Sequence, residues 1–324
     1  PSCPEMAGWF ALALALQSAP DLPAARPCTT QEMADLTTPS DQPYRLICRA
    51  DTGGRDIRRR VLIEGHAASG AALDCGGGDI RAPGQATTSA PTVAVWSRRQ
   101  GDGWSRPSDV SIRNCGVAGN VRIWGMGAGG SMRDLLASSR TAGHTLAAQS
   151  AAPIRVVMDR VRFQGMGTIP LYIGPGVTRT TVTRSRFSGR STSVAVYLDA
   201  ESAGALIQDN DFDIRTGREQ IAMDGSGANR IVGNRLSLSG RGGVFLYRNC
   251  GEDGVIRHQT PSYNQITDNV FVGAGWLRPR AVVIGSREGR RPYCGDDRGW
   301  PFGSSIDDGD GATGNLTARN SVRR

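Results

Sequence analysis

Short strand-like segments recur along this chain at a nearly constant spacing, and this repeat limits the possible fold more than any other feature. The large apolar residues that mark them are Phe163, Phe187, Phe212, Leu236 and Phe271. The steps between these residues are 24, 25, 24 and 35. Val322 follows after a further 51 residues, an interval long enough for two repeats, of which the first would contain 281–284. A period of this length is typical of stacked structural units.

A second set of strand-like segments keeps the same period. Its members are Tyr172-Ile173-Gly174, Tyr197-Leu198-Asp199, Ala222-Met223-Asp224 and Leu246-Tyr247-Arg248. Two separate markers with one period indicate that each repeat holds two or three short strands joined by tight corners. The repeat is too short to hold a crossover helix as well. Each turn of the chain must therefore lie on the next turn.

Composition agrees with an all-β chain that has many corners. The 324 residues include 43 Gly and only 6% aromatic residues, a profile of short strands and tight turns. Asn recurs just before the marker strand, at Asn210, Asn234, Asn269 and Asn320. Asn tolerates the left-handed conformation of a sharp corner, and its side-chain amide can bond to the equivalent Asn of the next turn.

These repeats resemble those of right-handed parallel β-helix proteins of the pectate-lyase-like superfamily. The resemblance covers residues 60–324 and implies a single-domain all-β solenoid that acts on a polysaccharide. We expect a signal or leader segment at 1–27, because residues 7–19 are apolar but too few to span a bilayer. A short N-terminal cap is expected at 28–59 and the β-helix domain at 60–324.

Residues 97–108 and 126–152 are rich in Gly, Ser and Arg and are expected to be loops or insertions. His66 and His144 have no aligned carboxylate or Arg partner, so we interpret them as ordinary loop residues.

Seven cysteines occur in the chain, and removal of the leader would leave six. An even number in an exported protein indicates disulfides. Pairing of sequence neighbours on adjacent turns predicts three bonds: Cys28–Cys48, Cys75–Cys115 and Cys250–Cys294. We therefore expect a secreted or periplasmic monomer without a transmembrane segment.

The net charge is +8, and all 38 basic residues are Arg. The absence of Lys excludes a Lys general base and a Schiff base. Guanidinium groups bind carboxylates, sulfates and phosphates through paired hydrogen bonds, so this balance suits an acidic substrate. The Arg residues are spread along the chain and no DNA-binding motif is present, which argues against a nucleic acid partner.

Alignment of the second set of segments places Gly174, Asp199, Asp224 and Arg248 at one position of four successive turns. Because neighbouring strands lie about 4.8 Å apart, the two Asp residues and Arg248 should form a ladder on one face. Such a pair of carboxylates could provide acid–base catalysis or coordinate Ca²⁺, although no cofactor is required. The alternative is a surface ladder that only stabilises the stack.

The interval that is stretched to 35 residues predicts a loop beside this ladder, where functional groups often gather. The residues expected to contact substrate are Arg218, Glu219, Tyr247, Asn249, Glu252, Arg257 and Arg287. His258 and Tyr263 from the same loop are candidate catalytic residues.

Elimination at a uronic acid needs a cation for the carboxylate, a base for the C5 proton and an acid for the leaving oxygen. Arg248 or Arg257 could supply the cation, His258 the base, and Tyr263 or Tyr247 the acid. An epimerase would return the proton to the opposite face. Lyase or epimerase activity is favoured because Arg, His and Tyr converge in this interpretation.

Two alternatives remain open. A glycoside hydrolase would use Asp199 and Asp224, with the distance between the carboxyl groups setting the stereochemical outcome. A noncatalytic carbohydrate-binding or surface β-helix would use the same ladders for stability and adhesion.

Overall fold

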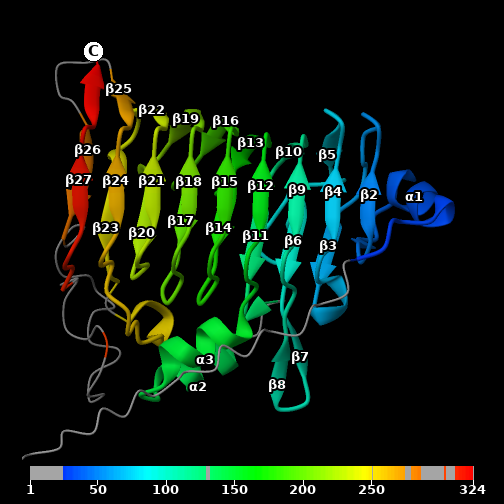
Figure 1. Cartoon of the computed structure of the whole chain (residues 1–324), viewed down its shortest axis with the longest axis horizontal. Helices are drawn as coiled ribbons and strands as arrows, with labels where there is room; N and C mark the ends of the chain where they lie inside the picture. Colours follow the sequence, from blue (N-terminus) through cyan, green and yellow to red (C-terminus); the bar gives the residue numbers. More distant parts are fainter. Residues whose placement is uncertain are drawn as a thin grey trace, which may run out of the picture.

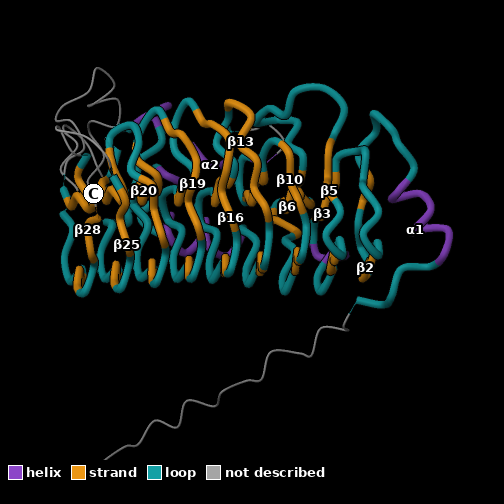
Figure 2. Tube along the Cα trace, turned by 90° about the horizontal axis from the view of Figure 1, so that it is seen from above, coloured by secondary structure: helices purple, strands orange, loops and turns teal. Residues whose placement is uncertain are grey.

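The computed structural model describes residues 25–128, 132–249, 251–273, 279–285, 303 and 311–323. Figure 1 shows the chain wound into an elongated solenoid, in which the strands of successive turns lie side by side from the blue N-terminal end to the red C-terminal end. The view from above in Figure 2 shows the stacked turns. Three long sheets, in which all pairing is parallel, make up the walls.

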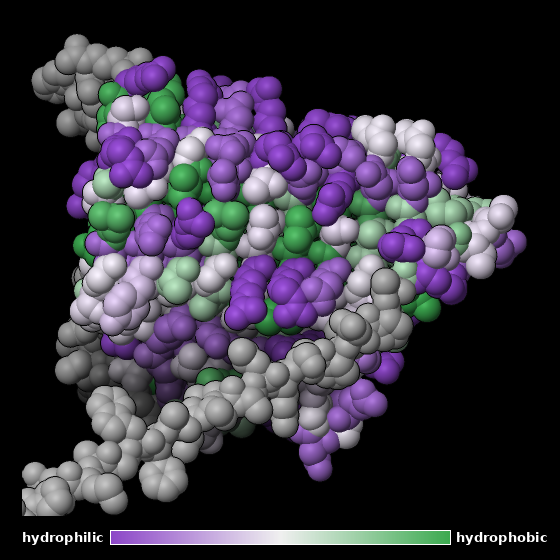
Figure 3. All heavy atoms as spheres, viewed as in Figure 1, coloured by the Kyte–Doolittle hydropathy of each residue, from purple (hydrophilic) through white to green (hydrophobic). Residues whose placement is uncertain are grey.

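Sheet A has nine strands in the order of the chain. They are β2 (Arg49–Asp51), β4 (Ala72–Asp74), β9 (Ser111–Arg113), β12 (Val157–Asp159), β15 (Thr181–Thr183), β18 (Leu206–Gln208), β21 (Arg230–Val232), β24 (Gln265–Thr267) and β27 (Leu316–Ala318). The face of the solenoid in Figure 3 mixes hydrophilic and hydrophobic residues and carries no continuous apolar patch.

Sheet B also has nine strands, and it positions the site described below. They are β1 (Tyr44–Arg45), β3 (Val61–Glu64), β6 (Val93–Trp96), β11 (Val121–Trp124), β14 (Leu171–Ile173), β17 (Val196–Leu198), β20 (Glu219–Asp224), β23 (Gly242–Tyr247) and β26 (Arg280–Ile284).

Sheet C has eight strands and contains the marker residues of the repeat. They are β5 (Asp79–Arg81), β10 (Gly116–Ala118), β13 (Arg162–Gly167), β16 (Arg186–Ser191), β19 (Asp211–Thr216), β22 (Arg235–Ser237), β25 (Val270–Val272) and β28 (Ser321–Arg323). Strands this short, closed into turns by corners, define an all-β right-handed parallel β-helix, as expected.

The marker residues stack in register inside the solenoid. The rings of Phe163 and Phe187, and those of Phe187 and Phe212, have centroids 4.4 Å apart and are nearly parallel, because they follow the spacing of the strands. Phe271 pairs directly with Val322. The 51-residue interval is therefore one turn with a long insertion, and the expectation of two turns is wrong.

The Asn residues form a buried ladder at the corner that precedes sheet C. The Nδ2 of Asn210 donates to Oδ1 of Asn234. In the same way the Nδ2 of Asn234 donates to Asn269, and that of Asn269 to Asn320, with N–O distances of 2.9–3.0 Å. The predicted amide bonding is confirmed. The predicted left-handed conformation is wrong for Asn itself, because the residue before each Asn adopts it, as in Asp209 with φ 56°. The Asn side chain instead faces inward to bond the next turn.

The amino-terminal end is closed by helix α1 (Thr30–Thr37), whose Leu36 covers the first turn and is fully buried. Thr29 and Glu32 form a capping box at its start. The solenoid begins earlier than expected, because β1 and β2 already pair with β3 and β4.

Two of the three expected disulfides, Cys28–Cys48 and Cys75–Cys115, are confirmed. Cys250 and Cys294 lie outside the described residues, as does the expected leader segment up to residue 24.

Both segments expected to be loops contain regular structure. Residues 97–108 include an antiparallel hairpin of β7 (Arg98–Gln100) and β8 (Gly103–Ser105). Residues 126–152 include α2 (Arg133–Ser139) and α3 (His144–Ala151), which pack through Leu135 and Ala151 against Val255. Figure 1 shows the hairpin and both helices on the same side of the solenoid.

Single 3-10 turns occur at η1 (His66–Ala68) and η3 (Glu252–Gly254). Within the described ranges, no helix is both long and apolar enough to cross a membrane.

Candidate functional site

The outer face of sheet B carries the predicted carboxylates on adjacent turns. Leu198 pairs with Met223, which brings the following residues, Asp199 and Asp224, next to each other as expected. The prediction for Arg248 is wrong, because Tyr247 pairs with Asp224. Leu246, in place of Tyr247, continues the apolar column inside the solenoid.

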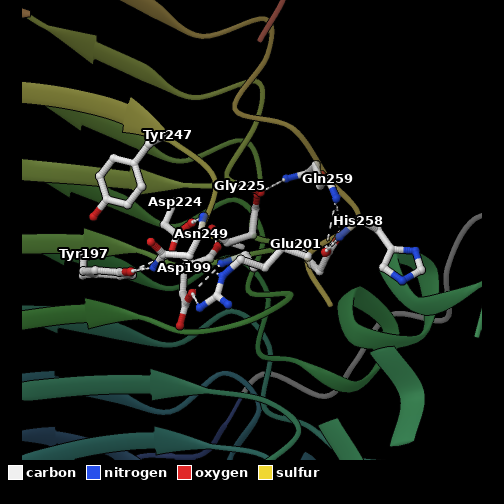
Figure 4. A network of polar contacts seen from close by, with 12 residues as sticks. Tyr197, Asp199, Glu201, Asp224, Gly225, Tyr247, Asn249, His258 and Gln259 are labelled. Carbon is white, nitrogen blue, oxygen red and sulfur yellow. Dashed lines mark hydrogen bonds and ion pairs between the residues drawn. The ribbon is translucent and has the colours of Figure 1, made fainter. Parts of the chain in front are cut away.

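Asp224 is fully buried, and its carboxylate is held by a set of donors (Figure 4). The Tyr197 hydroxyl donates to Oδ2 at 2.6 Å, and the side-chain amide of Asn249 donates to the same oxygen at 2.6 Å. The backbone N–H of Asn249 donates to Oδ1 at 2.8 Å. These bonds satisfy a charge that burial alone would make costly.

Asp199 occupies the equivalent place one turn earlier and is only 7% exposed. The Tyr172 hydroxyl donates to its Oδ2, and the Ala200 N–H donates to its Oδ1 at 2.8 Å. Burial raises the pKa of Asp199, and the nearby Asp224 raises it further, while Arg257 opposes this rise.

Arg257 takes the place beside the carboxylates that was predicted for Arg248. Its Nη2 lies 3.6 Å from Oδ1 of Asp199, and its Nε lies 3.3 Å from Oδ2 of Asp224. The Arg257 side chain is 9% exposed, so this ion pair is screened little by water. One guanidinium therefore bridges two buried carboxylates on adjacent turns.

Glu201 holds the loop that carries Arg257. Its buried carboxylate accepts from the Thr145 hydroxyl at 2.5 Å and from the backbone N–H of His258 at 2.7 Å. The N–H of Gln259 donates to both carboxylate oxygens at 3.2 Å. Burial raises the pKa of Glu201. Helix α3, the loop and the solenoid wall thus meet at one side chain.

His258 does not face the carboxylates. Its imidazole points toward the helices in Figure 4, where Nε2 lies 2.7 Å from the Ser139 carbonyl oxygen. The ring packs on that of His144, with centroids 5.1 Å apart. Nδ1 of His144 lies 3.0 Å from the Ser138 hydroxyl, and burial lowers the pKa of His144 to about 4. His144, expected to be a loop residue, starts helix α3.

Tyr263 also lies away from the carboxylates. It is 69% exposed and sits at a corner with φ 59°. Of the groups named for elimination, the structure therefore places Arg257 beside the carboxylates, whereas His258 and Tyr263 face away from them.

A cavity of about 420 Å³ opens on the outer face of sheet B, beside the helices α2 and α3. This volume is within the usual range for small-ligand sites. The polar and aromatic residues that line it include Trp124, His144, Tyr172, Tyr197, Asp199, Arg218 and Arg257. Asp224 does not line it.

The other predicted contact residues have different positions. Glu219 is fully buried and accepts a hydrogen bond from the Tyr247 hydroxyl at 3.3 Å, and burial raises the pKa of Glu219. Tyr247 is 1% exposed. Arg287 and the side chain of Glu252 lie outside the described residues.

The suggestion that the ladder carboxylates bind Ca²⁺ stays a prediction. The oxygens of Asp199 and Asp224 already accept hydrogen bonds, and Arg257 lies between the two groups. In the described ranges, the one cluster with ligand spacing includes Cys28 and Cys48, whose sulfurs form a disulfide.

Sequence reasoning missed Trp124, Tyr172 and His144 as lining residues. Tyr172 had a usable signal, because it is in register with Tyr197. The position of His144 depends on how two short helices pack, and the sequence carries no repeat there.

The fold and the cavity thus define a parallel β-helix with a polar pocket on one wall. No known protein family and no curated protein matches the sequence. Among solved structures, the chain is similar to PfbA, a surface adhesin of Streptococcus pneumoniae, with 12% identity and a TM-score of 0.44 over 85% of this chain and 62% of that chain. It therefore spans less than two thirds of the adhesin's length.

The chain is also similar to the A-module of the mannuronan C-5 epimerase AlgE4 of Azotobacter vinelandii. The identity is 10% and the TM-score 0.20, over 88% of this chain and 89% of that chain. For the Dettilon tailspike protein, the identity is 12% and the TM-score 0.26, over 76% of this chain and 60% of that chain.

Proposed function

We propose that this protein is an enzyme that acts on an acidic polysaccharide, by elimination or epimerisation at a uronic acid, in the cavity on sheet B. One observation carries the proposal. Two guanidinium groups, Arg218 and Arg257, line the same cavity as two carboxyl groups, an imidazole and two phenols. Such a set can neutralise an acid group and move a proton beside it.

Arg218 is the best candidate to bind the uronate carboxylate. It is partly exposed, and its Nε is buried without a hydrogen-bond partner among the described residues. Arg257 adds positive charge but is already engaged with two carboxylates. Neutralisation of the substrate carboxylate makes the adjacent C5 proton easier to remove.

His144 and Tyr172 provide the proton-transfer groups. Burial lowers the pKa of His144 to about 4, so its imidazole is neutral at pH 7 but a weak base. Removal of the C5 proton by His144 therefore depends on neutralisation of the uronate carboxylate by Arg218. Burial also raises the pKa of Tyr172 well above 10, so its hydroxyl keeps a proton to donate. In elimination the C5 proton goes to the base, the C4–O bond breaks, a C4=C5 double bond forms, and the leaving oxygen takes the donated proton.

Hydrolysis by a pair of carboxylates has less support. Asp199 lines the cavity, but Asp224 is fully buried and its oxygens are occupied by Tyr197 and Asn249. The other carboxyl group that lines the cavity belongs to the exposed Asp253 on η3, so the pair expected for hydrolysis, Asp199 and Asp224, does not face the cavity together. Two disulfides support export to an oxidising compartment, where a polysaccharide substrate would be met.

The test is incubation of the protein with alginate and with polygalacturonate. Elimination gives a product with the ultraviolet absorbance of a conjugated double bond, and epimerisation in D₂O places deuterium at C5, which NMR detects. We expect one of these signals, and we expect His144→Gln and Arg218→Gln to lower kcat by about 100-fold or more.

Tyr263→Phe is the matched control and should keep full activity, because its side chain is exposed at a distant corner. New reducing ends without the double bond would indicate hydrolysis and contradict the proposal. Binding without any turnover would indicate a noncatalytic protein.

A further inference from the structure

The outer face of sheet B continues past the cavity toward the amino-terminal end as a row of aromatic residues. Trp96 pairs with Trp124, and the Trp124 ring meets Tyr172 edge-on at 5.5 Å. The Arg122 guanidinium lies over the Tyr172 ring at 5.2 Å. This row connects the cavity on β14 and β17 with the turns nearer the amino terminus of the solenoid.

Both indoles in this row have an unsatisfied donor. Trp96 and Trp124 are 9% and 8% exposed, and the Nε1 of each is buried with no hydrogen-bond partner in the part of the chain that the structure describes. Buried donors normally have a partner. Trp124 also lines the cavity, so its indole forms the start of the row there.

A second cavity, of about 450 Å³, lies at the far end of this row, between the β7–β8 hairpin and α2. The charged residues that line it are Glu64, Arg98, Arg99, Arg133 and Asp134. Three of these five charges are already paired, since Arg99 lies 2.5 Å from Asp134 and Glu64 lies 2.6 Å from Arg45.

Arg98 and Arg133 remain without a carboxylate partner within the described ranges, and both are exposed. A concave surface with two uncompensated guanidinium groups favours an anionic ligand. Trp104, which also lines this cavity, contributes an apolar wall.

We propose that Arg98 and Arg133 bind acid groups of the same polysaccharide chain whose reacting sugar lies in the first cavity. This inference rests on the proposed function and adds that the substrate is a linear polyanion, with acid groups on sugars far from the reacting one. From Asp199 at the end of β17 to Glu64 on β3 there are four strand spacings, about 19 Å. A disaccharide cannot reach both cavities, whereas a hexasaccharide can.

The experiment is calorimetric binding to the full chain of disaccharides and hexasaccharides of galacturonate and of mannuronate, with maltohexaose as the neutral probe. We expect a hexasaccharide of one acidic series to bind about tenfold or more tightly than its disaccharide, which corresponds to one or two charge-assisted hydrogen bonds. The double variant Arg98→Gln, Arg133→Gln should lose this gain and bind the disaccharide as before.

Arg190→Gln, Arg215→Gln is the matched control, because these exposed arginines pair on sheet C and their loss changes the net charge equally. It should leave the gain intact. The proposal is overturned if the Arg98, Arg133 variant keeps the affinity gain of the hexasaccharide, or if its affinities for disaccharide and hexasaccharide fall equally. It is also overturned if the control variant loses the gain as well, or if no acidic oligosaccharide binds. Equal displacement of the hexasaccharide by single-stranded DNA of equal charge would also overturn it.

These outcomes can be separated from failure of the enzymatic proposal. A protein without turnover that still shows the length-dependent gain, and loses it in the Arg98, Arg133 variant, would retain the second site. An active enzyme whose long substrates are unaffected by that variant would lose only the second site.

Discussion

The Asn ladder and the carboxylate cluster are both buried columns of polar side chains, but they are built differently. In the ladder every turn supplies the same neutral amide, which donates to the next turn. In the cluster successive turns supply Gly174, Asp199, Asp224 and Tyr247, and the balancing charge comes from Arg257 on an inserted loop. A column of identical amides stabilises the stack, whereas a column of different side chains can also place several kinds of chemical group together in a site.

The strongest way to test this contrast is to remove the cation from the cluster. Arg257→Ala leaves Asp199 and Asp224 buried without their shared counter-charge, and the free energy of unfolding should fall by about 4 kcal/mol. Urea unfolding followed by circular dichroism measures this. A loss smaller than that of a ladder variant would show that the cluster does not depend on its charge balance.

A second test uses pH, because the Asn side chains of the ladder do not titrate, whereas the region around the carboxylate cluster holds buried titratable groups. The pKa of His144 is lowered from 6.5 to about 4 in the folded protein, so the unfolded chain binds more protons between these values. Its contribution to stability is therefore complete above pH 6.5 and is lost as the pH falls toward 4, by about 3 kcal/mol in total.

The measurement is the difference in unfolding free energy between the wild type and His144→Gln at several pH values. Burial raises the pKa values of Asp199 and Glu201, so their contribution is lost as the pH rises, but it cancels in this difference. A difference that stays constant with pH would contradict the assignment.

The third test concerns the ladder. Asn234→Ala removes the acceptor of Asn210 and a donor to the Ile207 carbonyl, so it should lower stability by about 2 kcal/mol without any pH dependence. Asn320→Ala, at the partly exposed last step, is the comparison and should cost less than about 1 kcal/mol. Equal losses would mean that depth in the stack is irrelevant.

The smallest effect is expected at the corner occupied by Tyr263. Tyr263→Gly relieves a left-handed conformation but removes packing of the ring on Gly314, so stability should change by no more than about 1 kcal/mol. Thermal unfolding and the activity assay should both be close to wild type. Loss of activity would return Tyr263 to the list of catalytic candidates.

Much of the fold could be predicted because the repeat is marked by large apolar residues, mostly Phe, and by cysteines, whose roles in a repeat are easy to recognise. The Phe column sets the register of sheet C, and the spacing of cysteines gives two disulfides. The adjacency of Asp199 and Asp224 follows from the same period. The insertions could not be predicted, because α2 and α3 are short, contain Ser and Thr, and are stabilised by packing on Val255.

The error at Arg248 has a specific cause. Leu246 and Tyr247 are both suitable for the interior by hydrophobicity, and a slip of one residue exchanges the two faces of a strand. The choice is decided by the Tyr247 hydroxyl, which finds a partner in Glu219 on the outer side. The role of Arg257 was equally hidden, because the anchor of its loop, Glu201, lies more than fifty residues away in the sequence.

The step of 25 residues from Ser185 to Asn210 has a consequence for how such a molecule can change in length. Excision of 185–209 would join Arg184 to Asn210 and leave every remaining side chain facing the same way, merely one layer shorter. Loss of a single amino acid within β19 would move the inward-facing side chains of the rest of that strand to its outer face, and the outward-facing ones to the interior. Within the strands, the architecture thus tolerates gain or loss of a whole layer far better than of a single residue, whereas the corners accept insertions of other lengths.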